Sequence, residues 1–187
     1  MGDNSTSKAV LRQVFEENYE AISRYCHRRL PRADANDAAA QVFAVAWRRF
    51  DSMPSGEQTL PWLYGVARNE VRTSRRSTRR LTNLRTKLGG QASYPEPGPE
   101  TVVIRNSEQE HLLKALATLR PDDQEILRLR AYEHLTLPEV AEVLGCSVEA
   151  AKKRASRATK RLRQATGWSD PTDAVQASGA IQEGGDR

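Results

Sequence analysis

Residues 135–163 constrain the fold most, because this stretch is patterned as a short helix, a glycine turn and a second helix. Thr136 can cap the first helix with Pro138 in its first turn, and Gly145 can end that helix in the left-handed conformation. Ser147 can then cap the second helix. Many proteins use this helix-turn-helix arrangement to place the second helix in the major groove of DNA.

The second of these helices carries charge of one sign on its outer face. Its apolar positions recur at three- and four-residue steps and form one stripe: Val148, Ala151, Ala155, Ala158 and Leu162. The cations that point away from this stripe, or lie beside it, are Lys153, Arg154, Arg157, Lys160 and Arg161. No acidic residue occurs between Lys152 and Arg163, so the face is not expected to neutralise itself by Glu–Lys pairs. An ordinary helical hairpin with a solvated charged face is the alternative, but the combined features favour DNA binding.

The length and composition indicate how many domains the chain forms and what kind of partner it binds. With 187 residues, 38% hydrophobic and 6% aromatic, two small helical domains fit best. A net charge of +5 and a pI near 9.5 favour a polyanionic partner. No stretch is patterned as a membrane span or a secretory signal, so we expect a cytoplasmic protein without membrane insertion.

The sequence gives no sign of a metal site, a cofactor or an enzyme. Cys26 and Cys146 are expected to be reduced thiols, with a redox bridge between them as the less favoured alternative. The three histidines have no spacing typical of metal ligands. Clustered carboxylates, a phosphate-binding glycine loop and a paired nucleophile and base are all missing from the pattern.

Residues 7–87 are expected to form one helical domain behind a disordered N-terminus at residues 1–6. The pattern predicts a helix that ends near Pro31, a second from an N-cap at Asp34 to Phe50, and a third from Pro61, with a loop at residues 51–59. The side chains of the first helix that should face the core are those of Val10, Leu11, Val14, Phe15, Ile22, Tyr25 and Leu30.

The third helix continues into a second basic stretch. After Glu70 all the charged residues of this stretch are cations: Arg72, Arg75, Arg76, Arg79, Arg80, Arg85 and Lys87. Trp62 and Tyr64 precede this stretch and could stack on exposed bases, which is how single-stranded nucleic acid is usually held. Burial of the tryptophan and a merely solvated basic tail remain the alternatives.

Glycine and proline divide the chain into its expected domains. Gly89, Gly90 and the segment 95–99 predict a flexible linker over residues 88–106. Residues 107–166 then form a winged-helix-like four-helix domain with the helix-turn-helix, and residues 167–187 are expected to be disordered. The predicted fold is therefore all-α, with two small helical domains joined by a flexible linker.

Three segments in this order carry a family resemblance. Residues 34–50 (DANDAAAQVFAVAWRRF) are similar to a polymerase-binding helix of the form D-A-E-D-L-V-Q-E-V-F-x-x-A-W, and residues 61–69 (PWLYGVARN) to a W-L-x-x-I-A-R-N segment. Residues 119–127 and 135–163 are similar to a domain that reads the minus-thirty-five promoter element. Over residues 8–165 the chain resembles bacterial RNA polymerase sigma factors of the extracytoplasmic-function (ECF) type, in the sigma-70 family.

The resemblance implies that the chain binds RNA polymerase core, at the beta-prime clamp and the beta flap, and directs promoter recognition, strand opening and transcription initiation. It also implies an anti-sigma factor as partner. Residues 7–87 would correspond to sigma region 2 and residues 107–166 to region 4. The implied polymerase contacts are Asp34, Asp37, Gln41, Phe43 and Trp47, the last two of which also fit the domain core.

The resemblance also implies two sets of DNA contacts. Single-stranded minus-ten DNA would be held by the loop at residues 51–59, with Trp62, Asn69, Arg72, Arg75 and Arg76. Minus-thirty-five duplex would be contacted by Ser147, Glu149, Ala150, Lys153, Arg154, Arg157, Lys160 and Arg161.

Two departures from the family pattern limit what the resemblance implies. Ala40 and Gln41 stand where the family has Gln and Glu, and residues 150–155 read A-A-K-K-R-A where the family has T-V-K-S-R-L. Promoter preference is therefore not implied. A stand-alone helix-turn-helix regulator remains the alternative, with Ala39, Val42, Phe43 and Ala46 as a dimerisation surface.

Overall fold

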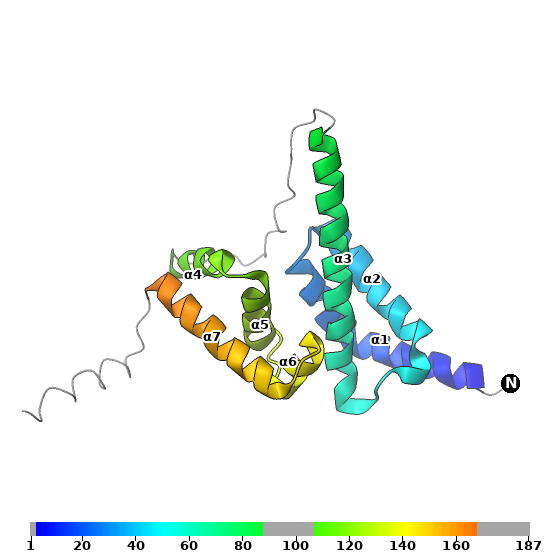
Figure 1. Ribbon diagram of the computed structural model, residues 1–187. Helices are drawn as coiled ribbons and strands as arrows, with labels where there is room; N and C mark the ends of the chain where they lie inside the picture. The colour runs from blue at the N-terminus through cyan, green and yellow to red at the C-terminus, as the bar shows by residue number, and fades with distance from the viewer. Residues whose placement is uncertain (1–2, 88–106, 168–187) are drawn as a thin grey trace, which may run out of the picture.

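The computed structural model describes residues 3–87 and 107–167, and all regular elements among them are helical. The first group contains α1 (Asp3–His27), α2 (Arg32–Arg48), two 3-10 turns (Phe50–Ser52 and Gly56–Gln58) and the long α3 (Thr59–Lys87). The second contains α4 (Ser107–Thr118), α5 (Pro121–Ala131), α6 (Leu137–Leu144) and α7 (Val148–Thr166). Figure 1 shows the two groups side by side, with the C-terminal end of α3 projecting beyond both. The expected linker at residues 88–106 and the tail from residue 168 lie outside the described residues.

Small side chains let the three helices of the first group approach one another closely. On α2 the residues that face inward are mostly alanines: Ala35, Ala38, Ala39, Val42 and Ala46. They pack against α1 and α3, where Ile22, Tyr25 and Leu63 are fully buried. Because Ala39, Val42 and Ala46 belong to this core, the predicted dimerisation surface on α2 is wrong.

The boundaries of these helices differ from the predicted ones by a few residues. Helix α1 already begins at Asp3 and ends at His27, before Pro31. Pro31 occupies the N-cap of α2, so Asp34 lies in the first helical turn rather than at the cap. An acidic residue there still stabilises the positive end of the helix dipole.

Two apolar residues of α1 that were expected to face inward lie at the surface. Val10 is 41% exposed and Phe15 is 43% exposed. Phe15 stacks on Tyr19, with ring centroids 4.9 Å apart, and meets Phe43 of α2 edge-to-face at 4.8 Å. Residues at the centre and at the edge of a buried helix face recur with the same spacing, so the sequence pattern does not distinguish core positions from edge positions.

The helix-turn-helix forms as its local sequence predicts. Thr136 and Glu139 make a capping box at the start of α6, in which the backbone N–H of Thr136 donates to the Glu139 carboxylate at 2.6 Å. Gly145 ends α6 in the left-handed conformation with φ of +63°, and the Ser147 hydroxyl accepts from the Ala150 N–H at 3.2 Å to cap α7. Ile126, Leu129 and Val140 are fully buried beneath the motif.

The two helical groups pack against each other through α3 and α6. Gly65 of α3 faces the backbone of Val143, where a Cβ atom added to the glycine would come within 3.9 Å of the Val143 Cα. Most of the buried apolar residues form one continuous cluster that includes Leu63 and Tyr64 on one side and Val140 and Val143 on the other. The chain therefore adopts an arrangement in which its two domains are docked.

Candidate nucleic-acid interface

Helix α7 presents an exposed basic ridge along its outer face. Its buried stripe is formed by Ala151 and Ala158, with Ala155 and Leu162 partly buried. Val148 was predicted to belong to this stripe but is 48% exposed. Lys153 and Lys160 lie on the exposed side, which gives a polyanion direct access to them.

A second basic edge of α7 faces the start of α5. Arg154, Arg157 and Arg161 line a surface cavity of about 410 Å³ together with Arg120, Pro121, Asp122 and Asp123. Pro121 occupies the first turn of α5, so the positive end of this helix dipole also points toward the cavity. The four guanidinium groups of this lining outnumber its two carboxylates, and together with the helix N-terminus they suit a phosphate group.

The basic face of α7 is partly neutralised, contrary to the sequence prediction. Arg161 forms an ion pair with Asp123, which is 8% exposed and comes from α5. Within α7, Lys153 lies 3.6 Å from Glu149 in an exposed pair. The sequence pattern missed the first pair because its partner lies on another helix, 38 residues away.

The start of α7 carries three further predicted contacts. Ser147 and Glu149 are exposed, whereas Ala150 is partly buried. The Ser147 hydroxyl accepts the hydrogen bond that caps α7, and this bond fixes its position. The structure thus gathers the predicted duplex contacts on one helix, divided between an outer ridge and an α5-facing edge.

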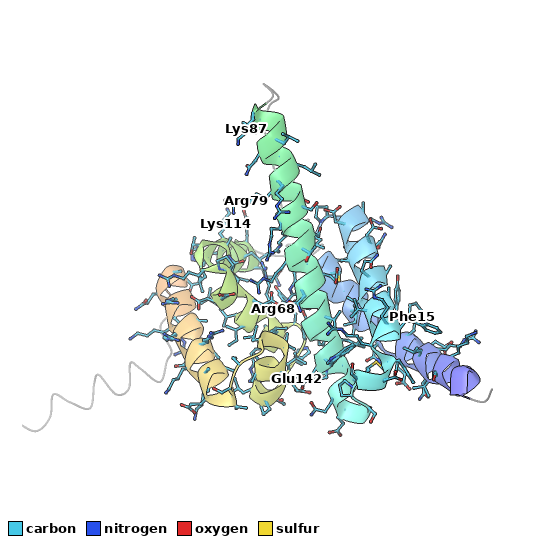
Figure 2. The ribbon with its side chains drawn as sticks, turned by 45° about the vertical axis from the view of Figure 1, so that its right-hand side comes forward. Phe15, Arg68, Arg79, Lys87, Lys114 and Glu142 are labelled. Atoms are coloured by element: carbon cyan, nitrogen blue, oxygen red, sulfur yellow. The ribbon has the colours of Figure 1, made fainter. Side chains whose placement is uncertain are left out.

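Helix α3 brings most of the predicted single-strand contacts onto one face. Four of these residues share a side of the helix, because successive spacings of seven, three and four residues separate them: Trp62, Asn69, Arg72 and Arg76. Asn69, Arg72 and Arg76 are exposed, whereas Trp62 is partly buried and packs against the hydrophobic core. In Figure 2 Lys87 lies at the end of α3 that projects beyond both helical groups, and Arg79 lies nearer to them on the same helix.

Arg75 does not share that face. Its Nη2 donates to the backbone oxygen of Arg29 at 2.9 Å, at the boundary between the two helical groups. Burial and the nearby Arg128 lower the pKa of its guanidinium. Arg75 as a whole is exposed and makes this contact within the protein, and its contact with the DNA backbone stays a prediction.

The segment at residues 51–59, predicted as a loop that would hold single-stranded minus-ten DNA, contains most of one 3-10 turn, Phe50–Ser52, and a second, Gly56–Gln58. The Thr59 hydroxyl donates to the Pro54 carbonyl at 3.0 Å and closes the segment onto the start of α3. Gly56 adopts a positive φ of +65°, which glycine allows without strain. The base-binding role of this segment stays a prediction.

The predicted polymerase contacts occupy two edges of α2. Asp37 and Gln41 are exposed on one edge, near the partly buried Asp34. Phe43 and Trp47 lie on the other edge, where Trp47 is 52% exposed and Phe43 contacts Phe15 and Tyr19. Sequence reasoning missed this aromatic surface, because the spacing of Phe15 predicts a core position.

Neither cysteine forms a disulfide, and the described residues contain no group of His, Cys, Asp and Glu that could hold a metal ion. Burial raises the pKa of the Cys26 thiol to about 12, which keeps it protonated at neutral pH. Within the described ranges, every helix is too short or too polar to cross a lipid bilayer.

Comparison with known proteins assigns both helical groups to one family. The family described as Sigma-70 region 2 matches residues 14–81, and Sigma-70, region 4 matches residues 109–162. The RNA polymerase sigma factor CnrH of Cupriavidus metallidurans is 30% identical over 142 residues, which are 71% of this chain and 73% of CnrH. The chain belongs to the sigma-70 family of RNA polymerase sigma factors.

Relatives named as ECF RNA polymerase sigma factors place this sigma factor in the ECF type; one is SigL of Mycobacterium tuberculosis, which is 26% identical over 87% of this chain and 92% of SigL. The RNA polymerase sigma factor NccH of Alcaligenes xylosoxydans is 26% identical over 87% of this chain and 95% of NccH. The solved structure of the sigma factor RpoE with the anti-sigma factor NepR from Bartonella quintana has a TM-score of 0.61 and 22% identity. It covers 85% of this chain and 98% of RpoE, and this likeness confirms the all-α two-domain fold. As a sigma factor, the protein binds RNA polymerase core and directs promoter recognition, strand opening and transcription initiation.

Proposed function

We propose that this sigma factor divides promoter recognition between α3 and α7. The observation that supports this division most directly is the presence of two basic helix faces in two separate helical groups. Helix α7 binds intact minus-thirty-five duplex, and α3 binds the single strand exposed at the minus-ten element. Each helix thus binds the form of DNA, duplex or single strand, that its side chains can recognise.

In the duplex-binding domain, the two edges of α7 have different tasks. Ser147, Glu149 and Lys153 lie near the start of the helix, where side chains reach base edges in the major groove. Arg154 and Arg157 bind a backbone phosphate in the cavity beside α5, and Arg120 joins them there. Arg120 is a DNA contact that sequence reasoning missed, because it lies outside the helix-turn-helix.

In the strand-opening domain, α3 supplies both stacking and charge. Removing a base from the DNA stack costs a few kcal/mol, which protein contacts must offset. Trp62 offers an aromatic surface about three turns before Arg72, and Asn69 offers hydrogen-bonding groups about one turn before it. Arg72 and Arg76 then hold the phosphates of the separated strand.

Polymerase binding involves α2, where Asp34, Asp37 and Gln41 form a polar edge and Phe43 and Trp47 an aromatic one. The protein carries out no covalent chemistry of its own and acts in the cytoplasm, where its polymerase works. A protein of the anti-sigma class restrains it, as NepR is bound to RpoE in the structure of that pair.

The test is to supply the purified chain to bacterial RNA polymerase core and sequence the transcript starts that appear. We expect start sites that depend on this protein and share two upstream elements. An α7 variant and an α3 variant should then fail at different steps, one at duplex binding and the other at strand opening. Failure of the chain to bind core polymerase would refute the proposal.

A further inference from the structure

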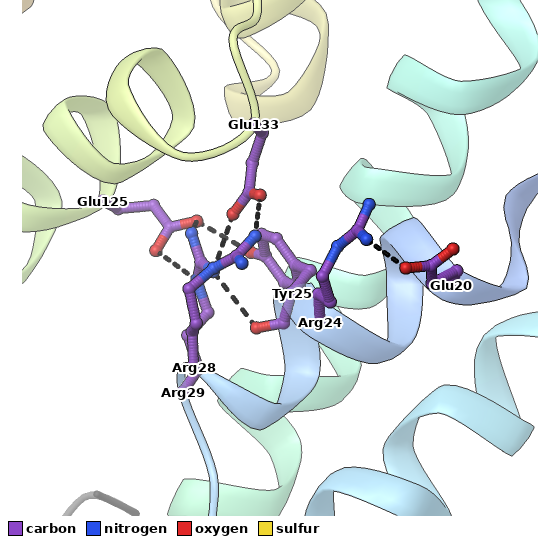
Figure 3. Close-up of polar contacts among 7 residues, drawn as sticks. All are labelled: Glu20, Arg24, Tyr25, Arg28, Arg29, Glu125 and Glu133. Atoms are coloured by element: carbon purple, nitrogen blue, oxygen red, sulfur yellow. Dashed lines mark hydrogen bonds and ion pairs between the residues drawn. The ribbon is translucent and has the colours of Figure 1, made fainter. Parts of the chain in front are cut away.

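The boundary between the two domains carries opposite charges on its two sides. The first domain contributes the cations Arg28, Arg29 and Arg68, and the second domain contributes the carboxylates of Asp122, Glu125 and Glu133. Figure 3 shows Arg28 and Arg29, at the end of α1, directed toward Glu125 and Glu133. Interdomain charge complementarity of this kind specifies how the surfaces dock.

Arg29 is the centre of this boundary, because its side chain is only 1% exposed. Its Nε lies 3.0 Å from Glu125 Oε2, and its Nη1 lies 3.0 Å from Glu133 Oε1. The guanidinium also lies over the Tyr25 ring, 3.6 Å from the centroid, while the Tyr25 hydroxyl donates to Glu125 at 2.7 Å. One buried cation of the first domain is thus held by two carboxylates of the second.

Further contacts surround this centre. Arg28 forms an ion pair with Glu133, whose side chain is 1% exposed, and also lies over the Tyr132 ring. Arg68 of α3 lies 3.7 Å from Asp122. Arg75 donates to the backbone of Arg29, so α3 supports the same site from the first domain.

Docking of the domains covers part of the DNA-contacting face of α3. Gly65 lies between Trp62 and Asn69 on this face, three residues after one and four before the other. The backbone of Val143 in α6 approaches Gly65 directly, at about 3.9 Å from where a Cβ would be. A DNA strand that runs along Trp62 and Asn69 would meet α6.

The boundary also buries ionised groups. Burial would raise the pKa of Glu125, but Arg29 and the hydrogen bonds from Arg29 and Tyr25 hold it below the ordinary value of 4.5. The carboxylate is therefore charged, and so is Arg29. Because buried charges lose much of their hydration, a complete ion-pair network adds little net stability, whereas loss of one partner is strongly unfavourable. The docked state depends on keeping the full set of pairs.

We propose that Arg29, Glu125 and Glu133 form an interdomain clasp that holds the free sigma factor closed and covers the part of the minus-ten face of α3 around Gly65. This inference rests on the proposed role of α3. A partner that binds only the separated domains, such as polymerase core, must open the clasp. If nine molecules in ten are closed, the apparent affinity of that partner is reduced about tenfold.

The experiment is a disulfide-trapping assay on the full chain. Cys26→Ala and Cys146→Ser remove the native thiols, and Gly65→Cys with Val143→Cys place new thiols on the two facing helices, where a Cβ atom added to Gly65 would lie 3.9 Å from the Val143 Cα. We expect rapid cross-linking in the free protein. Adding Glu125→Gln and Glu133→Gln should slow cross-linking about tenfold or more. Without its carboxylate partners, the Arg29 guanidinium is more stable in water than in the boundary, so the domains separate.

The matched control is Glu20→Gln, which removes a carboxylate paired with Arg24 on the exposed side of α1 (Figure 3). It should leave the cross-linking rate unchanged, and circular dichroism should show equal helix content in all variants. An unchanged rate in the Glu125→Gln, Glu133→Gln protein would overturn the clasp. Transcription by the chain without the engineered cysteines reports separately on the proposed function, so its failure is distinguishable from a failure of the clasp.

A second readout tests the regulatory consequence. Without the engineered cysteines, the protein carrying Glu125→Gln and Glu133→Gln should bind core polymerase several-fold more tightly than the unmodified chain. Small-angle scattering of the same protein should show a larger radius of gyration. Equal size and equal affinity for core polymerase would contradict the proposal.

Discussion

The basic helices α3 and α7 differ in what lies against their DNA-contacting faces. The ridge of α7 is open to solvent along its length, and its arginine edge borders a surface cavity. The corresponding face of α3 has α6 lying against it at Gly65. The comparison indicates that charge identifies a nucleic-acid-binding helix, whereas packing decides whether it can bind in a given arrangement of domains.

The largest effect should come from the open helix. Arg154→Ala combined with Arg157→Ala should weaken duplex binding by about 100-fold, since a hydrogen bond to a charged group contributes about 1.5 kcal/mol or more. The salt dependence should also fall, with a slope lower by about two. Titration of a promoter duplex at several salt concentrations measures both effects.

The control for that pair is Arg12→Ala with Arg24→Ala, which removes two charges from exposed pairs on α1. If this control weakened duplex binding as much as the α7 pair, net charge rather than the α7 edge would account for the affinity.

The next effect should appear only after the domains open. Trp62→Ala should reduce promoter opening by polymerase about 10-fold to 100-fold, because stacking of a base on an aromatic ring contributes about 1–3 kcal/mol. Trp62→Phe should retain most of the activity. Permanganate footprinting of unpaired thymines measures opening, and duplex binding by the free chain should be unaffected. Loss of duplex binding in Trp62→Ala would indicate a general folding defect instead.

A smaller effect is expected at the missed residue Arg120. Arg120→Ala should lower the salt slope of duplex binding by about one and the affinity by up to about tenfold. Arg48→Ala, an exposed change on α2, serves as its control. An unchanged slope would mean that the cavity beside α5 does not hold a phosphate.

The smallest effect is expected from a modest fall in pH. The pKa of Glu125 is held below 4.5 in the docked state, so its contribution to docking is fully present above that value. It is lost only as the pH falls through the lower, docked value. The disulfide-trapping rate, corrected for the ionisation of the thiols, should therefore be equal at pH 7 and pH 6, and slowing within this range would contradict the assignment.

Local signals were sufficient to predict the helix-turn-helix. The caps at Thr136, Gly145 and Ser147 each depend on residues within four positions of one another, so the chain specifies them wherever the motif lies. The family resemblance then predicted the order of the two domains, which the family matches confirm, while the role of each basic helix stays a prediction.

Long-range packing could not be predicted in the same way. Phe15 and Val148 fit an apolar stripe by spacing, yet each lies at the edge of the core. The pairs Arg161–Asp123 and Arg29–Glu125 join residues 38 and 96 positions apart, and neither pair leaves a periodic signal in the sequence. The contacts between the domains could therefore not be predicted from the sequence.

The alanine-rich inner face of α2 has a consequence for which mutations the first domain can accept. Alanine has almost no side-chain entropy to lose and buries little area, so the helices there are held by close backbone approach rather than by bulky side chains. Replacement of Ala39 or Ala46 by valine adds volume where none is available and should destabilise the fold by about 1–3 kcal/mol. The least tolerant positions of this domain are thus among its smallest residues.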